Sequence, residues 1–247
     1  MKKEIFVKDV FCSLAIVCFL FVVCAGMFVQ EKNEAILVSA NSEYNGTIYA
    51  GDKASKNVSL MVNVYWGNEH LEKMLEIFEN NDVKTTFFVG GSWVRDNPDL
   101  LKKIYDAGHE IANHGTNHKE HGKISYEQNL TEIQTCHEIV KHVLGVNMEL
   151  FAPPGGSYSK HTTKASGDLG YKTIMWTRDT IDWRDKNTQL ILNRATTNMS
   201  GGDLILMHPT SFTVDALQGI IEHAKTKGLN ITTVSETLGF EKTNEPA

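Results

Sequence analysis

Cysteine is scarce in this 247-residue chain, and its placement excludes two kinds of site. Three of the four cysteines, Cys12, Cys18 and Cys24, lie in an apolar N-terminal stretch, so Cys136 is the only one in the rest of the chain. A single thiol cannot form an intradomain disulfide and cannot build a cysteine-based zinc site. We interpret Cys136 as a small buried hydrophobic residue on a predicted helix.

Positive charge is also limited, and the common phosphate-binding motifs are missing. Lys and Arg total 24 against 30 Asp and Glu, which gives a net charge of −6. Because nucleic-acid binders usually carry a basic face, we expect no nucleic-acid partner. Neither GxGxxG nor GxxxxGK[ST] follows the first predicted strand, so we also expect no nucleotide cofactor. The hydrophobic fraction of 41% is enough for a packed core and argues against disorder.

Residues 10–29 contain no charged side chain. As a helix this stretch would span about 30 Å, which is the thickness of the hydrocarbon part of a bilayer. Lys2, Lys3 and Lys8 precede it, so the positive-inside rule places residues 1–9 in the cytoplasm and the remaining chain outside. We therefore predict a single-pass membrane protein with an extracytoplasmic domain. A cleaved signal peptide is the alternative, and it would give a secreted protein.

The rest of the chain divides into a linker, one domain and a tail. Residues 30–56 show no sustained periodicity and are expected to form a linker, whereas residues 241–247 are expected to form a frayed tail. Between them, residues 57–240 alternate between strand-like and helix-like patterns. Strands separated by helices pair in parallel. We predict a distorted (β/α)7 barrel, with an open doubly wound sheet as the alternative.

The predicted elements place polar clusters at similar positions. The expected strands cover residues 58–65, 85–89, 110–113, 149–151, 172–176, 203–207 and 230–233. Unusual polar or aromatic residues follow several of them, at 65–69, 114–118, 153–156, 179–183 and 208–209. In β/α folds the loops after the strands converge on one face, and the active site lies there. The recurrence at one topological position predicts a functional site.

His114 and His118 form the sharpest local signal. Their i, i+4 spacing lets both imidazoles point the same way from one helical turn, and neutral imidazole is a good ligand for zinc. His121 extends the same pattern. A polar loop that merely contains histidines is the alternative, because the chain has ten of them. We predict a divalent metal site here, with zinc as the expected ion.

His208 ends the apolar strand 204–207 and is a candidate general acid. Its ordinary pKa lies near neutrality, which suits the protonation of an amine leaving group. Asp182 is expected to orient its ring, with Asp179 as the substitute, although both aspartates are also typical turn caps. Trp183 offers a flat wall for a sugar ring, and buried packing is the alternative for this side chain.

With these residues in view, the domain resembles the polysaccharide deacetylase family, also called the NodB-homology domain or carbohydrate esterase family 4. The segment 108–118, Gly-His-Glu-Ile-Ala-Asn-His-Gly-Thr-Asn-His, is similar to the metal-binding motif of that family. Residues 85–90, 179–183 and 204–208 are similar to its second-strand, fourth and fifth motifs. The resemblance implies a seven-unit β/α barrel, a divalent metal and removal of N-acetyl groups from cell-wall sugars.

The first and third motifs depart from the family pattern. The first motif of the family is normally Thr-Phe-Asp-Asp-Gly, whereas this chain has Asn-Val-Tyr-Trp-Gly at 63–67. Tyr65 stands where the resemblance implies a catalytic base, and Trp66 stands where it implies a third metal ligand. Ala152 replaces the arginine that normally steadies the base.

Two hypotheses follow, and the sequence favours the first. In the first, the domain is a deacetylase in which His114 and His118 hold the metal, with His121 or Glu69 as the third ligand. Tyr65 would donate a hydrogen bond to the oxyanion and His208 would shuttle the proton, with Glu69 as an alternative base. In the second, the domain binds wall glycan through aromatic side chains without chemistry. The expected sugar-contacting residues are Trp66, Pro153, Pro154 and Trp183.

Overall fold

The computed structural model describes residues 43–44 and 46–240. The predicted membrane segment at residues 10–29, the cytoplasmic residues 1–9 and the tail at 241–247 lie outside this part of the chain. Within the described residues, every helix is too short or too polar to cross a lipid bilayer.

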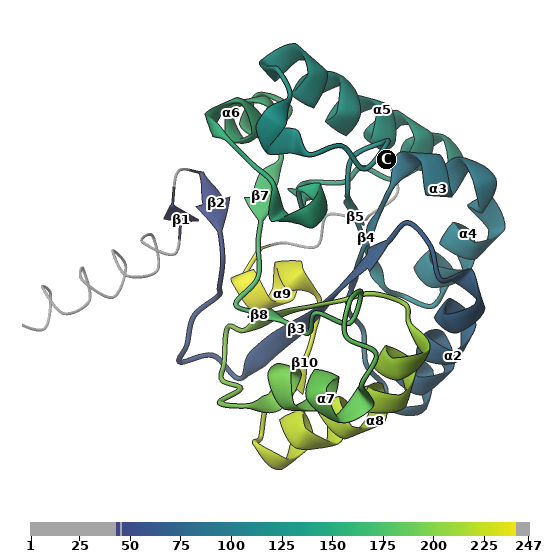
Figure 1. The fold of residues 1–247 in the computed structure, drawn as a ribbon, viewed down its shortest axis with the longest axis vertical. Helices are drawn as coiled ribbons and strands as arrows, with labels where there is room; N and C mark the ends of the chain where they lie inside the picture. Colours follow the sequence, from purple (N-terminus) through teal and green to yellow (C-terminus); the bar gives the residue numbers. More distant parts are fainter. Residues whose placement is uncertain (1–42, 45, 241–247) are drawn as a thin grey trace, which may run out of the picture. The chain divides into compact units, whose positions relative to one another are not determined.

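The described residues form a curled sheet of mainly parallel strands (Figure 1). The strand order is β1-β2-β7-β6-β5-β4-β3-β9-β8, and β10 also pairs with β3. Among the described strands, every pair is parallel except β1 with β2. Neighbouring strands in the run from β7 to β3 are also consecutive in the chain, which confirms the parallel α/β prediction and is consistent with a (β/α)7 barrel. The strands are β1 (Glu43–Tyr44), β2 (Thr47–Ile48), β3 (Asn57–Val64), β4 (Thr86–Val89), β5 (Glu110–Asn113), β6 (Leu150–Phe151), β7 (Lys172–Ile174), β8 (Arg178–Asp179), β9 (Leu204–Met207) and β10 (Asn230–Ile231).

Helices lie on the outer side of the curled sheet, as Figure 1 shows for α2 to α5 and for α7 and α8. They are α2 (Asn68–Asn80), α3 (Gly91–Asp96), α4 (Pro98–Asp106), α5 (Tyr126–Leu144), α6 (Lys160–Asp168), α7 (Thr188–Thr196), α8 (Ser211–Thr226) and α9 (Val234–Leu238). Two short 3-10 turns, η1 (His121–Lys123) and η2 (Pro154–Gly156), interrupt the loops after β5 and β6. The helices therefore leave the loops at the carboxyl ends of the strands free to build a site.

Strand β3 shows why the sheet has two apolar faces. Leu60 and Val62 belong to the core between the sheet and the helices, whereas Met61 packs with Phe88 in a second, interior core. Alternate side chains of a strand point to opposite faces, so both faces of β3 need apolar residues. Asn63 follows in the interior series and is 4% exposed. It places a polar side chain where the interior opens toward the carboxyl ends of the strands.

Helix α5 begins and ends where the sequence predicts. Ser125 accepts a hydrogen bond from the backbone N–H of Gln128, and the Gln128 side chain completes the capping box. Gly145 ends the helix in the left-handed conformation, with φ of +73°. Cys136 lies on the buried face of this helix and is fully buried, which confirms the interpretation as a small core residue.

The folded domain begins earlier than we expected. Strands β1 and β2 lie within the stretch that the sequence assigned to a linker, and β2 pairs with β7. Thr47 and Ile48 stand opposite Thr173 and Ile174 in that pair. A strand of two residues is too short to show a periodic pattern of apolar side chains. The sequence pattern does not predict β8, α3 or α9 because these elements are also short. The part of the expected linker from β1 onward therefore belongs to the domain.

Candidate functional site

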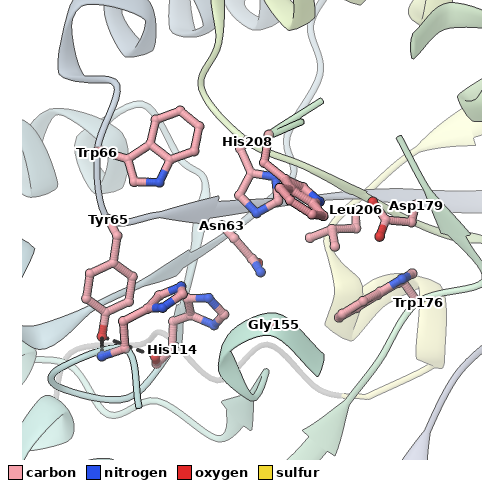
Figure 2. A pocket seen from close by; sticks show the side chains of 11 residues that line it. Asn63, Tyr65, Trp66, His114, Gly155, Trp176, Asp179, Leu206 and His208 are labelled. Atoms are coloured by element: carbon pink, nitrogen blue, oxygen red, sulfur yellow. Dashed lines mark hydrogen bonds between the residues drawn. The ribbon is translucent and has the colours of Figure 1, made fainter. Parts of the chain in front are cut away.

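A pocket of about 610 Å³ opens at the carboxyl ends of β3, β5, β8 and β9, where the sequence predicts a site. Figure 2 shows that its side chains come from loops far apart in the chain and surround one cavity. The lining residues are Asn63, Tyr65, Trp66, His114, His118, Gly155, Trp176, Asp179, Trp183, Leu206 and His208. The fold thus brings both predicted metal-binding histidines and the predicted general acid to the same cavity.

Tyr65 leaves β3 with its hydroxyl directed at the loop that carries the histidines. The hydroxyl donates to the backbone carbonyl of Gly115 at 2.8 Å and accepts from the backbone N–H of His118 at 2.9 Å. Burial raises the pKa of this phenol, so it stays protonated. Its single proton is already donated, and this geometry does not provide the free oxyanion donor that we expected of Tyr65.

His114 follows β5 and is 1% exposed. Its Nδ1 donates to the backbone carbonyl of Ala152 at 2.7 Å, which fixes the neutral tautomer with its lone pair on Nε2. Burial, followed by repulsion from His118, holds the pKa of His114 well below its ordinary value. His118 lies with its ring centre 5.6 Å from that of His114, and burial also lowers its pKa. The pocket therefore contains two neutral imidazoles side by side.

Glu132 on α5 holds the loop between these histidines, and the sequence analysis did not single it out. Its Oε2 accepts from the backbone N–H groups of Thr116 and Asn117 at 3.1 and 2.8 Å. Its Oε1 accepts from the Asn117 side chain at 2.8 Å and pairs with Lys119 at 2.9 Å. Desolvation acts to raise the pKa of Glu132, yet these contacts outweigh it and lower the pKa. The sequence contains one indication of this role, because it places the Glu132 carboxylate on the buried face of a predicted helix.

His121 lies behind this loop, in the turn η1, and is fully buried. Its Nδ1 donates to the Asn129 side chain at 2.7 Å, and its ring packs 5.0 Å from that of Phe151. Its Nε2 is buried without a hydrogen-bond partner and faces Gly115, where an added Cβ would lie 2.8 Å away. The Gly115 backbone therefore lies beside Nε2 of His121, which is the atom that would bind the metal in the predicted ligand set.

The donor set does not fit a catalytic zinc site. Such sites use three protein ligands, and on this side the pocket presents two imidazoles, those of His114 and His118. The third imidazole of the pocket, His208, is bonded to Asp182 on the opposite side. Among the described residues, no three His, Cys, Asp or Glu side chains lie close enough together to hold a metal ion. Trp66 occupies the position at which the family resemblance implies the third ligand. The predicted set of His114, His118 and His121 is therefore not assembled as a metal centre in this structure.

Asp182 and His208 form a closely bonded pair on the other side of the pocket. The ring Nδ1 of His208 donates to Asp182 Oδ1 at 2.8 Å, and the backbone N–H of His208 donates to Oδ2 at 2.6 Å. Thr213 donates its hydroxyl to the same Oδ2 at 2.6 Å, and Asp182 is 2% exposed. The carboxylate fixes the orientation of the imidazole, as the sequence predicts, and leaves its Nε2 on the side away from Asp182.

A strained turn places Asp182 under His208. Ile181 has φ of +53°, which is a rare conformation for a β-branched residue. The turn is held because Asp179 Oδ1 accepts from the backbone N–H of Ile181 at 2.8 Å, and the Ile181 carbonyl accepts from Asp185 N at 2.9 Å. Asp179 therefore acts as the turn residue that the sequence offered as one interpretation, and Asp182 rather than Asp179 bonds to the His208 ring. Asp179 also lines the pocket.

Aromatic side chains form much of the cavity wall. Trp66 and Trp183 are 45% and 56% exposed, and Trp66 stacks on the His208 ring with the two planes 5° apart and their centres separated by 5.9 Å. Pro153 and Pro154 are buried, and Gly155 beyond them lines the pocket. The flat walls expected for sugar binding are therefore the tryptophans rather than the prolines.

Glu69 lies on the far side of Trp66. It belongs to the first turn of α2, is largely exposed and lies 3.5 Å from His70. It lines a neighbouring pocket of about 300 Å³ that shares Tyr65 and Trp66 with the larger one. This position does not agree with the predicted role of Glu69 as a base or a metal ligand beside the histidines.

The family model for polysaccharide deacetylases matches residues 50–174, so the chain belongs to the polysaccharide deacetylase family. This finding confirms the resemblance. The chain is 39% identical over 212 residues to the uncharacterized protein YlxY of Bacillus subtilis, covering 86% of this chain and 66% of YlxY. It is 31% identical over 175 residues to a peptidoglycan-N-acetylglucosamine deacetylase of Bacillus cereus, covering 68% of this chain and 82% of the relative.

A solved structure of similar fold is that of BA3943, a CE4 family pseudoenzyme from Bacillus anthracis. It is 37% identical, with a TM-score of 0.76, and the match covers 78% of this chain and 68% of BA3943. A BA3943 mutant with restored enzymatic activity matches with the same TM-score. Both hydrolases and a protein without activity therefore share this fold.

Proposed function

We propose that this domain binds cell-wall glycan in the pocket of Figure 2 and does not hydrolyse it. The observation that carries the proposal is the placement of Tyr65 and Trp66. The family resemblance implies two aspartates at these positions. The Tyr65 hydroxyl is bonded within the loop, and Trp66 covers the ring of His208. This reverses the order in which the sequence ranked the two hypotheses.

The arrangement provides no carboxylate base beside the histidines. A general base has to lie within hydrogen-bond reach of the proton that it removes. Tyr65 has a raised pKa and Glu69 lies beyond Trp66, whereas Asp179 stands across the cavity from His114 in Figure 2. Loss of a general base typically lowers a rate by about 10²–10⁴-fold. The incomplete metal donor set would lower it further.

The relatives support glycan as the ligand class. The Bacillus cereus relative is a peptidoglycan-N-acetylglucosamine deacetylase, and BA3943 shows that the fold occurs without activity. The pocket adds a physical argument, because Trp66 and Trp183 hold large aromatic faces in contact with water. A sugar ring that stacks on such a face removes apolar surface from water.

The test measures binding and turnover in the same preparations of the full chain. Calorimetry with soluble peptidoglycan fragments is expected to show binding, and acetate analysis is expected to show no release with zinc, cobalt or manganese supplied. Trp183→Ala is expected to weaken binding, whereas Leu190→Ala, which removes another exposed apolar side chain, serves as the matched control. Acetate release above the background of a His208→Ala variant would overturn the proposal.

A deacetylase with an altered base is the second candidate, and the Asp182–His208 pair favours it. A buried carboxylate that orients an imidazole is suited to proton transfer, and His208 would then protonate the amine leaving group. In this case acetate release is detectable in the native chain and is lost in His208→Ala. A pH profile of the rate that responds to Asp182→Asn would distinguish this role from loss of folding.

Restoring a carboxylate provides a second experiment. Trp66→Asp would place an acidic side chain beside His114 and His118, so we expect tighter zinc binding than in the native chain, measured by calorimetry. Trp66→Leu removes the same indole without adding a carboxylate and is the control. Equal zinc affinity in both variants would show that the two histidines are not positioned for a metal.

We also propose that the domain works outside the membrane, held there by residues 10–29. The support is the uncharged sequence of this segment and the lysines before it. Fractionation of cells that express the full chain should place it in the membrane, with the domain accessible to added protease. Recovery in the cytoplasmic fraction would exclude this location.

A further inference from the structure

In the part of the chain that the structure describes, the lining of the glycan pocket contains a carboxylate and no Lys or Arg side chain. Asp179 is the only Asp, Glu, Lys or Arg among the lining residues that the structure describes. Asp182 adds a second carboxylate directly behind His208. The pocket therefore presents negative charge to a ligand, and the chain as a whole carries a net charge of −6.

Asp179 is placed to receive a donor from the cavity. Its Oδ1 accepts from the backbone N–H of Ile181 at 2.8 Å, which leaves Oδ2 for a ligand. Figure 2 shows the carboxylate directed toward the cavity, on the same side as Trp176. Two guanidinium groups, those of Arg184 and Arg194, lie within electrostatic range of Asp179. Both are hydrogen-bonded to Asp185, and neither belongs to the residues that line the pocket.

Desolvation raises the pKa of Asp179 and outweighs the opposing effects of the Ile181 N–H, His208 and Arg194, so its negative charge is only partly compensated. A bound cation would offset this cost, whereas a neutral amide would not. The face of Trp176 acts in the same direction, because an indole face attracts cations as well as sugar rings. The Trp183 ring already has the Arg184 guanidinium 5.8 Å from its centre.

We infer that this pocket prefers the ammonium group of a de-N-acetylated amino sugar to the neutral acetamido group of the acetylated form. The inference rests on the proposed function, because it names which form of glycan the same site takes. An ammonium group offers three N–H donors and a positive charge to Asp179, and it lies against aromatic faces. The domain would then recognise the product of deacetylation rather than its substrate.

The test compares two defined probes with the full chain at neutral pH, where Asp179 keeps its charge and much of the sugar amine carries its proton. The probes are the tetramer of β-1,4-linked N-acetylglucosamine and the fully de-N-acetylated tetramer. We expect the amine form to bind about tenfold more tightly or better, measured by calorimetry.

Asp179→Asn is the diagnostic variant. The amide oxygen of Asn can still accept from Ile181 N, so the turn is kept while the negative charge is lost. We expect this variant to bind both tetramers equally, with the loss confined to the amine form. Asp215→Asn makes the same charge change on the exposed side of α8 and is expected to keep the preference.

The outcomes separate this inference from the proposed function. Equal binding of the two tetramers by the native chain, or tighter binding of the acetylated one, overturns the preference and leaves glycan binding in place. A preference that survives in Asp179→Asn, or that is lost in Asp215→Asn, also overturns it, because the attraction is then not local to the pocket. Binding of neither tetramer, nor of peptidoglycan fragments, removes both proposals.

Discussion

The two sides of the pocket differ in whether their hydrogen bonds involve a charged side chain. On the histidine side, formed by Tyr65, His114 and His118, hydrogen bonds run to backbone groups and the imidazoles are neutral. On the dyad side, formed by Asp182 and His208, a buried carboxylate bonds directly to the imidazole. The two sides therefore differ in their physical chemistry although they line one pocket.

Each side nevertheless depends on one buried carboxylate. Glu132 supports the histidine side through two successive backbone N–H groups of the loop at 116–117. Asp182 supports the dyad side through one backbone N–H group, the His208 ring and the Thr213 hydroxyl. Glu132 therefore fixes more of the path of the chain than Asp182 does. We therefore expect the histidine side to be the more sensitive one when its carboxylate is removed.

Glu132→Ala should have the largest effect on stability. It leaves the buried N–H of Thr116 and the partly buried N–H of Asn117 without their acceptor, and a buried group left without a partner costs about 1–3 kcal/mol. We expect the free energy of unfolding to fall by about 4 kcal/mol in urea titrations. Glu127→Ala on the exposed face of the same helix is the control. An equal loss in both variants would contradict the role of Glu132.

Asp182→Ala should have the next largest effect. It removes the acceptor for the His208 ring, the His208 backbone N–H and the Thr213 hydroxyl. We expect a loss of about 3 kcal/mol, because part of this region is open to water. Unchanged NMR signals of the loop at 114–118 in this variant would show that the histidine side does not depend on Asp182. Broadening of those signals would show that the two sides are not independent.

Acidification should weaken the histidine side. The pKa of His114 and of His118 is lowered in the fold, so the unfolded chain binds more protons once the pH falls below about 6.5. Their contribution to stability is present above that pH and is lost as the pH falls, by about 1.4 kcal/mol for each unit of pKa difference.

Urea titrations at neutral and acidic pH check this expectation, because the free energy of unfolding should be lower at acidic pH. His109 is a separate source, because burial lowers its pKa to about 4. A His109→Asn background removes that contribution. If His114→Asn in this background leaves the acid sensitivity unchanged, the histidine side is not the origin of the effect.

Tyr65→Phe should have the smallest effect of the four. It keeps the ring and removes the hydroxyl that bridges Gly115 and His118, which costs about 1 kcal/mol. Glycan binding is expected to stay within about twofold of the native value, since the hydroxyl faces the loop. A loss of binding without a loss of stability would mean that the phenol contacts the ligand.

The sequence predicted the fold well where elements are long and periodic. Helix α5 has its predicted caps, and β5 has its predicted bounds at Glu110–Asn113. The hairpin of β1 and β2 was missed because two residues carry no period. Its place in the sheet comes from pairing with β7, which is a contact between distant parts of the chain.

The site was predictable in position but not in detail. Motifs placed His114, His118 and His208 on one face, because strand ends converge. Spacing alone placed His121 with them, yet its ring turns behind the loop to bond Asn129. The direction of the Tyr65 hydroxyl could not be predicted either, since its partners are backbone groups whose positions depend on the folded loop.

The contact between Tyr65 and Gly90 has a consequence for engineering. A Cβ on residue 90 would overlap the phenol ring, so the missing side chain at the end of β4 is what makes room for that ring. Shortening Tyr65 to an acidic residue would leave a hole that Gly90 cannot fill. Placing a carboxylate at position 65 is then a problem of volume as much as of charge, and such a design would have to fill the space of the phenol ring from a neighbour such as residue 90.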